Sequence, residues 1–233
     1  DDTVDEDNTY TIELSGNDID GDSLTFQASV DGNGSASVDG STLSITPDAD
    51  YNGDIVVSVL VSDGQASGSG SFTLTVTPVN DAPVIGTIDN QEIDEDTSLD
   101  VSELATATDI DSESEYFTFS LAVYGNATVD QDALMVTPTE NYNGDIAVTV
   151  TVSDGDLSDS TTFTLVVNPV NDAPTLDAIS DDTVDEDNTY TTQLSGTDID
   201  GDSLTFQASV DAYGSASVDG STLTVTPDTD YNG

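Results

Sequence analysis

A repeat of about ninety residues runs through this chain and constrains its fold more than any other feature of the sequence. Short motifs recur in the same order in each copy: Asp-Glu-Asp at 5–7, 94–96 and 185–187, Asp-Ile-Asp at 18–20, 109–111 and 198–200, and Tyr-Asn-Gly at 51–53, 142–144 and 231–233. A fixed period of this length indicates one structural unit copied in tandem. The fold of the chain is therefore expected to be the fold of one unit, repeated.

The spacing of the motifs predicts three domains, at 1–79, 80–170 and 171–233, with Asn-Asp-Ala-Pro opening the second and third. Against the complete second repeat, the first lacks its opening strand and the third lacks its last two strands. We therefore expect the array to continue on both sides of the given residues, or its ends to be completed by neighbouring chains. Residues 1–53 and 181–233 differ at only eight positions, so the first and third repeats are near copies.

Apolar and polar residues alternate along much of the chain, as in 23–30 and 71–77, and Asp, Asn and Gly lie between these runs. This pattern is typical of half-buried strands. A disordered chain would not need it, although the high net charge alone is compatible with disorder. In the complete repeat we expect strands at about 84–88, 97–107, 116–123, 127–130, 133–136, 146–153 and 161–167. Seven short strands in about ninety residues predict an all-β, two-sheet sandwich.

The 48 Asp and Glu residues have no Lys, Arg or His to balance them, and the formal net charge is −48. Binding to nucleic acid or to an anionic membrane requires cationic side chains, so we expect no nucleic-acid partner and no membrane insertion. No disulfide can form, because the chain has no Cys. Clustered carboxylates must therefore be solvated, protonated or bound to cations from outside. Oxygen ligands without imidazole or thiolate select Ca²⁺ or Mg²⁺.

The order of the acidic motifs resembles that of cadherin repeats. Ala-Thr-Asp-Ile-Asp at 107–111 is similar to the cadherin Asp-x-Asp motif, and Val-Asn-Asp-Ala-Pro at 79–83 is similar to the cadherin linker. Together with Tyr-Asn-Gly, this is the pattern of bacterial cadherin-like tandem repeats of large secreted adhesins. The resemblance implies seven-stranded cadherin-like or Ig-like Greek-key β-sandwiches in a linear array, with Ca²⁺ between successive repeats.

Carried over position by position, the resemblance implies the following ligands at the first junction: Glu6, Asp48, Asp50, Asn80, Asp81, Asp109, Asp111 and Asp154. At the second junction it implies Glu95, Asn171, Asp172, Asp198 and Asp200. There, Thr139 and Asn141 stand where the first junction has Asp48 and Asp50. We therefore expect the second junction to bind fewer ions or to bind them more weakly. For acids outside these positions, the simpler interpretation is a charged surface that keeps an extracellular protein in solution.

The leading functional hypothesis is a calcium-rigidified extender region of an extracellular adhesin or surface fibre, secreted or at the cell surface, whose partners are its own neighbouring repeats. The alternative is a protein whose identical chains associate into calcium-bridged filaments in cell–cell or biofilm adhesion. An enzyme, such as a glycosidase with paired carboxylates, is not expected, because 48 acids produce close pairs by chance. A carbohydrate-binding module also stays open, but the chain has no Trp to stack on a sugar.

Overall fold

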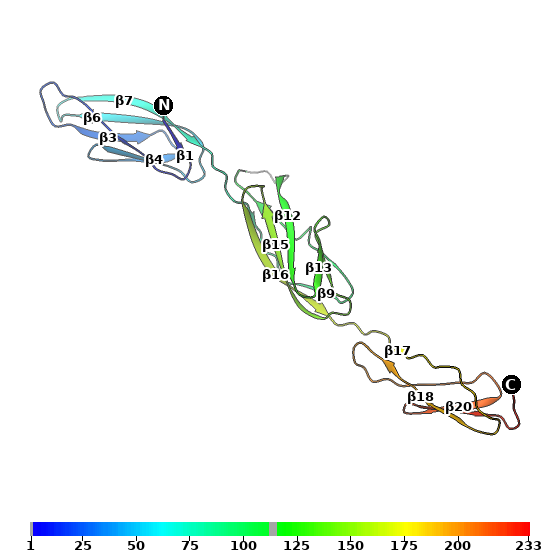
Figure 1. Ribbon diagram of the computed structural model, residues 1–233. Helices are drawn as coiled ribbons and strands as arrows, with labels where there is room; N and C mark the ends of the chain where they lie inside the picture. The colour runs from blue at the N-terminus through cyan, green and yellow to red at the C-terminus, as the bar shows by residue number, and fades with distance from the viewer. Residues whose placement is uncertain (1, 112–115) are drawn as a thin grey trace. The chain divides into compact units, whose positions relative to one another are not determined.

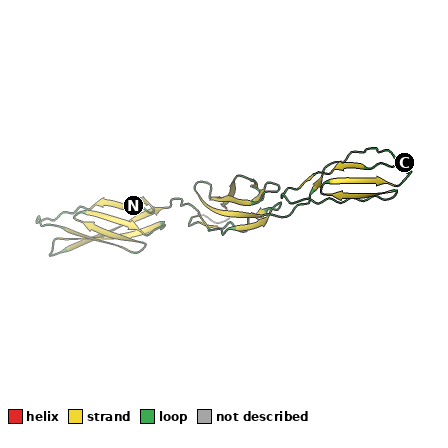
Figure 2. Cartoon of the chain, turned by 90° about the horizontal axis from the view of Figure 1, so that it is seen from below, coloured by secondary structure: helices red, strands yellow, loops and turns green. Residues whose placement is uncertain are grey.

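The computed structural model describes residues 2–111 and 116–233, which form β-strands and connecting loops without any α-helix (Figures 1 and 2). The prediction of an all-β chain is therefore confirmed. The chain divides into two compact units, one made of 1–87, 104–120 and 150–161 and the other of 88–103, 121–149 and 162–233. Among the described residues, no helix has the length and apolar character needed to cross a membrane.

Seven strands form the first sandwich: β1 (Asp2–Asp5), β2 (Tyr10–Glu13), β3 (Thr25–Val30), β4 (Gly34–Asp39), β5 (Thr42–Pro47), β6 (Gly53–Ser62) and β7 (Ser67–Thr77). One sheet has the order β1-β7-β6-β3 and the other the order β2-β5-β4. β1 runs parallel to β7, while β6 and β7 form a long antiparallel hairpin. The chain passes between the sheets after β1, β2, β3 and β5, which is the expected Greek-key arrangement.

The core of this sandwich lies between β5 on one sheet and the β6–β7 hairpin on the other. Its fully buried side chains are Leu43, Ile45, Ile55, Val57, Leu74 and Val76, each at most 2% exposed. Burial of one such side chain stabilises the fold by about 1.5–3 kcal/mol. The hairpin therefore supplies all the core residues of its own sheet that are at most 2% exposed.

The Tyr-Asn-Gly motif forms the corner at which the chain enters β6. The Tyr51 hydroxyl donates a hydrogen bond to the Asp54 carbonyl at 3.0 Å, and its ring lies against Gly53. A Cβ atom on Gly53 would lie 2.8 Å from the Tyr51 hydroxyl oxygen, and Gly53 has a φ of +139°. Only glycine fits this position without strain, which explains why Tyr and Gly recur together in every copy.

The second repeat contains nine described strands: β8 (Val84–Ile85), β9 (Gln91–Asp94), β10 (Leu99–Asp100), β11 (Ala107–Thr108), β12 (Thr118–Tyr124), β13 (Ala127–Asp130), β14 (Met135–Pro138), β15 (Gly144–Ser153) and β16 (Ser158–Asn168). Their sheets have the orders β12-β15-β16-β9, β10-β14-β13 and β11-β8. The larger sheet repeats the arrangement of the first sandwich, with β9 parallel to β16 as β1 is to β7.

Two details of the strand prediction were wrong. The expected strand at 97–107 is interrupted, because the Asp100 carboxylate accepts a hydrogen bond from the Ser102 amide at 2.9 Å and turns the chain between β10 and β11. The strand β9 was not predicted at all. It has two acids among its four residues, which are rare in strands, and it is held at a sheet edge by a parallel pairing that no local pattern reveals.

The third repeat forms β17 (Thr175–Leu176), β18 (Tyr190–Gln193), β19 (Gly196–Thr197), β20 (Gly214–Asp219) and β21 (Thr222–Pro227). β18, β21 and β20 make the same three-stranded sheet as β2, β5 and β4 in the first sandwich. Residues 205–210, however, form no strand, although their sequence is identical to that of β3. In the first sandwich β3 pairs only with β6.

Candidate metal centres

Three carboxylates from distant parts of the sequence meet in the first unit. Oxygen atoms of Glu6, Asp81 and Asp111 all lie within 4.8 Å of one another. Glu6 follows β1 and is only 2% exposed; its amide donates to the Thr77 carbonyl at 2.9 Å, and its Oε1 accepts a hydrogen bond from the Val79 amide at 2.6 Å. The backbone around β7 thus fixes both ends of this glutamate.

A second group of carboxylates shares Asp81 with the first. It comprises Asp7, Asp50 and Asp81, again with oxygen atoms within 4.8 Å of one another. Asp7 and Asp50 both adopt left-handed backbone conformations, with φ of 58° and 56°. Asp and Asn tolerate this conformation better than most residues. The two turns are joined by a hydrogen bond of 3.2 Å from the Asp50 amide to Asp7 Oδ1.

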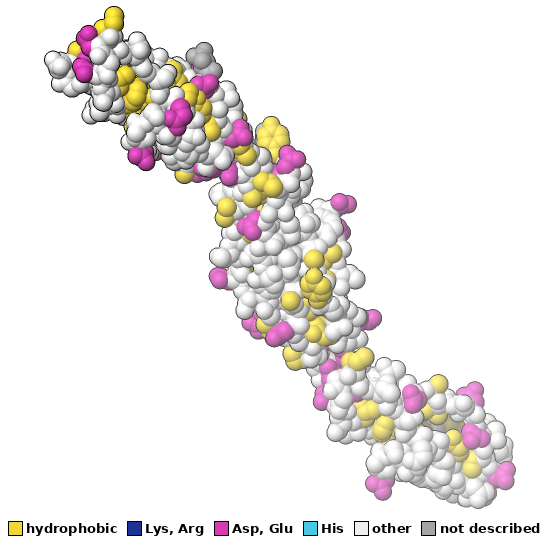
Figure 3. Space-filling model, turned by 60° about the vertical axis from the view of Figure 1, so that its left-hand side comes forward, with side chains coloured by type: hydrophobic (Ala, Val, Ile, Leu, Met, Phe, Trp, Pro, Cys, Tyr) yellow, Lys and Arg dark blue, Asp and Glu magenta, His cyan; other side chains and the backbone are white. Residues whose placement is uncertain are grey.

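The Asp81 carboxylate combines a buried oxygen with neighbours of negative charge. Its Oδ2 is buried and has no hydrogen-bond partner in the structure. Desolvation, and after it the negative charge of Asp111, raises the pKa of this carboxyl above its ordinary value. Two carboxylates at about 4 Å repel each other by roughly 4 kcal/mol at an effective dielectric constant near 20. No Lys or Arg exists to offset this repulsion (Figure 3).

The spacing of the oxygens fits Ca²⁺. This ion takes six to eight oxygen ligands at 2.3–2.6 Å, so oxygens on one ion lie at most about 5 Å apart. Oxygen atoms that lie within 4.8 Å of one another, as in each group, are close enough to share one ion. All the side-chain donors are oxygens, as a hard cation requires. Each group can therefore supply three carboxylates to one calcium ion.

The second unit contains a matching group, formed by Glu95, Asp172 and Asp200. Glu95 is 4% exposed and accepts a hydrogen bond from the Val170 amide at 2.6 Å, as Glu6 does from Val79. The Asp172 amide donates to Asp200 Oδ2 at 2.6 Å, which repeats the 2.8 Å bond from Asp81 to Asp111. Asp172 Oδ2 is again buried without a partner, and desolvation, then Asp200, raises the pKa of this carboxyl.

The two units differ at the position of Asp50. Asn141 occupies the equivalent turn with the same φ of 56°, and its amide donates to Asp96 Oδ1 at 2.9 Å. The two turns therefore have the same backbone φ at this position, but in the second a neutral amide replaces the carboxylate. In the described part of the second unit, only one group of three acids is found.

Asn80 and Asp154, also predicted as ligands, lie next to each other. The Asn80 side-chain amide donates to Asp154 Oδ2 at 2.8 Å and to the Asp81 carbonyl at 2.9 Å. Asp154 Oδ1 accepts hydrogen bonds from the amides of Asp156 and Leu157, both at 2.8 Å. These bonds, that of Asn80 first, lower the pKa of Asp154. Asn171 makes the same contact with the Asp172 carbonyl, at 2.8 Å.

Like Asn80, Asp154 and Asn171, three further predicted ligands lie outside the carboxylate groups. The Asp48 amide donates to the Asn33 carbonyl at 3.0 Å in a turn. Asp109 Oδ1 accepts the Asp111 amide at 2.7 Å and so orients the loop that carries Asp111. Asp198 Oδ1 accepts the Asp202 amide at 3.0 Å. Metal ligation by these three residues, as by all the other predicted ligands, stays a prediction.

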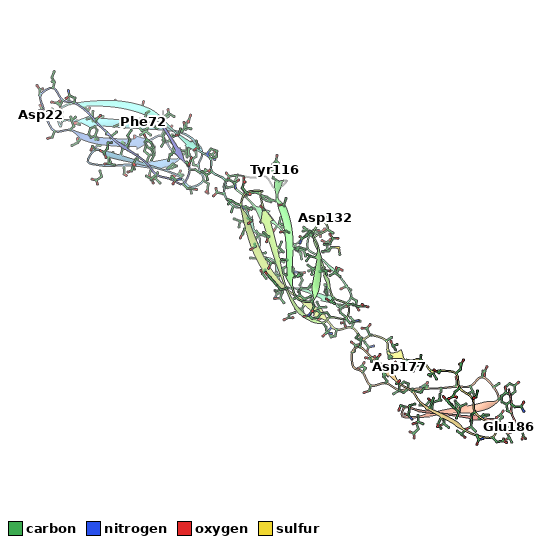
Figure 4. The ribbon with its side chains drawn as sticks, viewed as in Figure 1. Asp22, Phe72, Tyr116, Asp132, Asp177 and Glu186 are labelled. Carbon is green, nitrogen blue, oxygen red and sulfur yellow. The ribbon has the colours of Figure 1, made fainter. Side chains whose placement is uncertain are left out.

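Asp7 was missed by sequence reasoning, although it belongs to the recurring Asp-Glu-Asp triplet. The recurrence of the whole triplet was the available signal, but only the Glu was chosen from it. In the third repeat the same triplet makes no such centre. Glu186 is exposed (Figure 4), although the Asp230 amide still donates to Asp187 Oδ1 at 3.1 Å.

Comparison with known proteins agrees with the repeat structure. A family model described as "Bacterial Ig domain" matches residues 1–77, 80–167 and 171–233. No curated protein matches the chain at a significant level.

Several solved structures resemble the chain at low sequence identity. Human protocadherin-24 EC1-2 is 17% identical over 67% of this chain and 86% of its own, with a TM-score of 0.44. Drosophila N-cadherin EC1-4 is 14% identical over 94% of this chain and 61% of its own, with a TM-score of 0.40. An endo-fucoidan hydrolase from glycoside hydrolase family 107 is 17% identical, with a TM-score of 0.30; the match covers 97% of this chain but 38% of the hydrolase.

Proposed function

The chain belongs to the bacterial Ig domain family, and from this premise we propose that it is a structural repeat region whose domain junctions bind calcium. The observation that carries the proposal is the buried carboxylate oxygen that lacks a partner in both units, on Asp81 and on Asp172. In a chain without a single Lys or Arg, an external cation is the positive charge that would satisfy these oxygens.

Binding would join the segments that supply the ligands. In the first unit these are the end of β1, the turn before β6, the segment after β7 and the loop after β11. The two ions together would tie the linker residue Asp81 to carboxylates that precede and follow it in the sequence. Calcium at each junction would therefore stiffen the connection between repeats, so that the region acts as an extender of an adhesin or surface fibre.

An extracellular location, secreted or at the cell surface, is part of this proposal. Calcium sites in extracellular modules have dissociation constants of about 10⁻⁴–10⁻³ M. Sites of that affinity stay occupied only where free calcium is in the millimolar range, as it is outside cells. The proposed role is not enzymatic: apart from its carboxylates, the chain has no His, Cys or Lys for acid–base or nucleophilic chemistry.

Thermal unfolding with and without calcium tests the proposal. The 233-residue protein would be melted in 5 mM CaCl₂, in 5 mM MgCl₂ and in EDTA at constant ionic strength. At 5 mM calcium, about five to fifty times these Kd values, each bound ion adds roughly 1–2 kcal/mol to the free energy of unfolding. We expect a large rise of the melting temperature in calcium. Equal melting in calcium and EDTA would contradict the proposal and leave the acids as a charged surface.

A second candidate is calcium-bridged association of identical chains into filaments. It is favoured by the exposed acids of the third repeat, of which Asp187 and Asp230 are already joined through the backbone. Sedimentation velocity in calcium and in EDTA distinguishes the two functions. Polymers that dissolve in EDTA would support filaments, and a monomer in both conditions would exclude them.

A further inference from the structure

A tripeptide of the form Asn-x-Ser/Thr, in which x is not Pro, occurs twice in the chain, as Asn-Gly-Ser at 33–35 and Asn-Ala-Thr at 126–128. This tripeptide is the acceptor sequence for N-linked glycans, and because so short a match arises easily by chance, its surroundings decide its value. In both cases the Asn directly precedes a strand, β4 in the first repeat and β13 in the second.

The two Asn residues occupy the same place in their repeats. The Asn33 carbonyl accepts a hydrogen bond from the Asp48 amide at 3.0 Å, and the Asn126 carbonyl accepts one from the Thr139 amide at 2.8 Å. Thr139 is the residue that stands in the second repeat where the first has Asp48. The two tripeptides therefore fall on one structural position of the repeat, although the first and second repeats are distant copies.

Both acceptor side chains are open to solvent. Asn33 and Asn126 are exposed, and so are Ser35 and Thr128, which carry the hydroxyl group of each tripeptide. Neither Asn side-chain amide makes a hydrogen bond to any residue that the structure describes. The nitrogen atoms that would react are thus within reach of an enzyme, as a glycan acceptor on a surface turn requires.

The backbone alone does not account for these Asn residues. Asn33 has a φ of 57°, which Asn tolerates better than most residues. At the equivalent place of the third repeat, however, Tyr213 adopts a φ of 61°, and its carbonyl accepts the Asp228 amide at 3.0 Å. Asn126 is not among the described residues that have a positive φ. The turn therefore accepts a residue other than Asn at this place.

We propose that Asn33 and Asn126 are attachment sites for N-linked glycans. In the transfer step, the side-chain nitrogen Nδ2 forms a bond to C1 of a sugar that is activated as a diphosphate ester. The bond between C1 and the diphosphate oxygen breaks, the diphosphate leaves, and the amide loses one proton to the transferase. The product is a bulky, solubilising surface group that uses no carboxylate. The proposal rests on the proposed surface location, because the chain must meet a transferase during its export.

Mass spectrometry of the protein purified from the cells that produce it tests the proposal. Trypsin cannot cut a chain without Lys or Arg, so a protease that cleaves before Asp is used, and it releases peptides 31–38 and 111–129. We expect each peptide to carry the added mass of a glycan, which fragmentation places on the Asn. Unmodified Asn at both sites, or sugar attached to Ser35 or Thr128 instead, would overturn the proposal.

Variants of the 233-residue protein, secreted from a eukaryotic host that N-glycosylates exported proteins, test the turn as an acceptor. Ser35→Ala should abolish the glycan on Asn33 and leave that on Asn126, whereas Ser37→Ala, at an exposed residue of the same strand, is the matched control and should leave both. Tyr213→Asn completes the tripeptide in the third repeat and should add a third glycan.

The shift in gel mobility, and its reversal by an amidase that removes N-linked glycans, counts the glycans in each variant. A glycan on Asn33 that persists in Ser35→Ala, or no added glycan in Tyr213→Asn, would overturn the proposal. The glycans are detected without calcium, so their absence would leave the calcium proposal standing. Equal melting in calcium and EDTA would likewise leave the glycan sites untouched.

Discussion

Asp7 accepts a hydrogen bond from the backbone amide of Asp50, at 3.2 Å between Oδ1 and N, and this bond holds two acidic turns together in a chain without basic residues. Both residues lie in left-handed backbone conformations. The bond leaves the Asp50 carboxylate free to face Asp81, so that three acids meet within 4.8 Å. Local backbone geometry thus builds a group of charges that no internal partner neutralises.

The number of ions should follow the number of carboxylate groups. We expect three bound calcium ions for the protein, one for each group. Asp81→Asn should remove two of them, because Asp81 belongs to both groups of the first unit, whereas Asp172→Asn should remove one. Isothermal titration calorimetry measures the stoichiometry. Asp132→Asn, a change on an exposed turn (Figure 4), is the control and should leave it unchanged. Equal losses for Asp81→Asn and Asp172→Asn would contradict the sharing of Asp81.

Asp50 and Asn141 occupy equivalent turns, and substituting each by the other's residue type should reverse the difference in calcium binding between the two units. Asn141→Asp supplies the missing carboxylate on a backbone that already has the required φ of 56°. We expect it to add an ion to the second unit or to tighten binding there about tenfold, which is about 1.4 kcal/mol. Asp50→Asn should weaken the first unit by a similar factor. Titration of each variant with calcium, compared with the same titration of the parent protein, measures both changes. An unchanged isotherm would contradict a role of this turn in binding.

The effect of removing a buried charge should change sign with calcium. Glu95→Gln keeps an acceptor for the Val170 amide, 2.6 Å away in the parent protein, but loses the negative charge. In EDTA this change relieves repulsion among the acids, so the melting temperature should stay equal or rise. In calcium the variant should melt at a lower temperature than the parent. Glu186→Gln, at the exposed equivalent position, is the control and should leave the melting temperature unchanged in both conditions. A lower melting temperature of Glu95→Gln in EDTA would indicate that Glu95 has a purely structural role.

Sequence reasoning identified the sandwich because its signals are local. Alternation of apolar and polar residues marks β12 and β16, and the Tyr-Asn-Gly corner recurs in each copy. The parallel edge strand β9 escaped prediction, since its pairing with β16 joins residues far apart in the sequence. Local sequence does not decide residues 205–210 either, because they form no strand although their sequence is identical to that of β3.

The candidate site, too, could be predicted only in part from the sequence. The motifs led to Glu6, Asp81 and Asp111, which the structure does bring together. They did not lead to Asp7, because its contribution depends on a left-handed φ and on a turn more than forty residues away. Nor did they show that the Asp154 carboxylate is engaged by Asn80 and by two amides of its own hairpin turn.

Stability should fall at alkaline pH through Tyr10. Burial, and after it the hydrogen bond that its hydroxyl donates to Asp2 at 2.7 Å, raises the pKa of Tyr10 from 10.0 to about 12. Between these values the unfolded chain loses the proton while the folded chain keeps it, so the free energy of unfolding decreases as pH rises. Below pH 10 this contribution is fully present.

Urea denaturation at pH 8, 10 and 11 measures this dependence. Tyr10→Phe should flatten the decrease above pH 10, and Tyr190→Phe, at the equivalent place in the third repeat, is the matched control. The same slope in the parent protein and in Tyr10→Phe would show that Tyr10 does not set it.

One carboxylate, Asp81, stands in two groups at once, and this has a consequence for how the protein would sense its surroundings. Under the proposed binding, the first ion to arrive fixes a side chain that the second ion also needs, so that the second binds with less loss of entropy. Occupancy of the first unit would then rise steeply over a narrow range of calcium concentration. The first unit would therefore be stiff above a threshold calcium concentration and flexible just below that concentration.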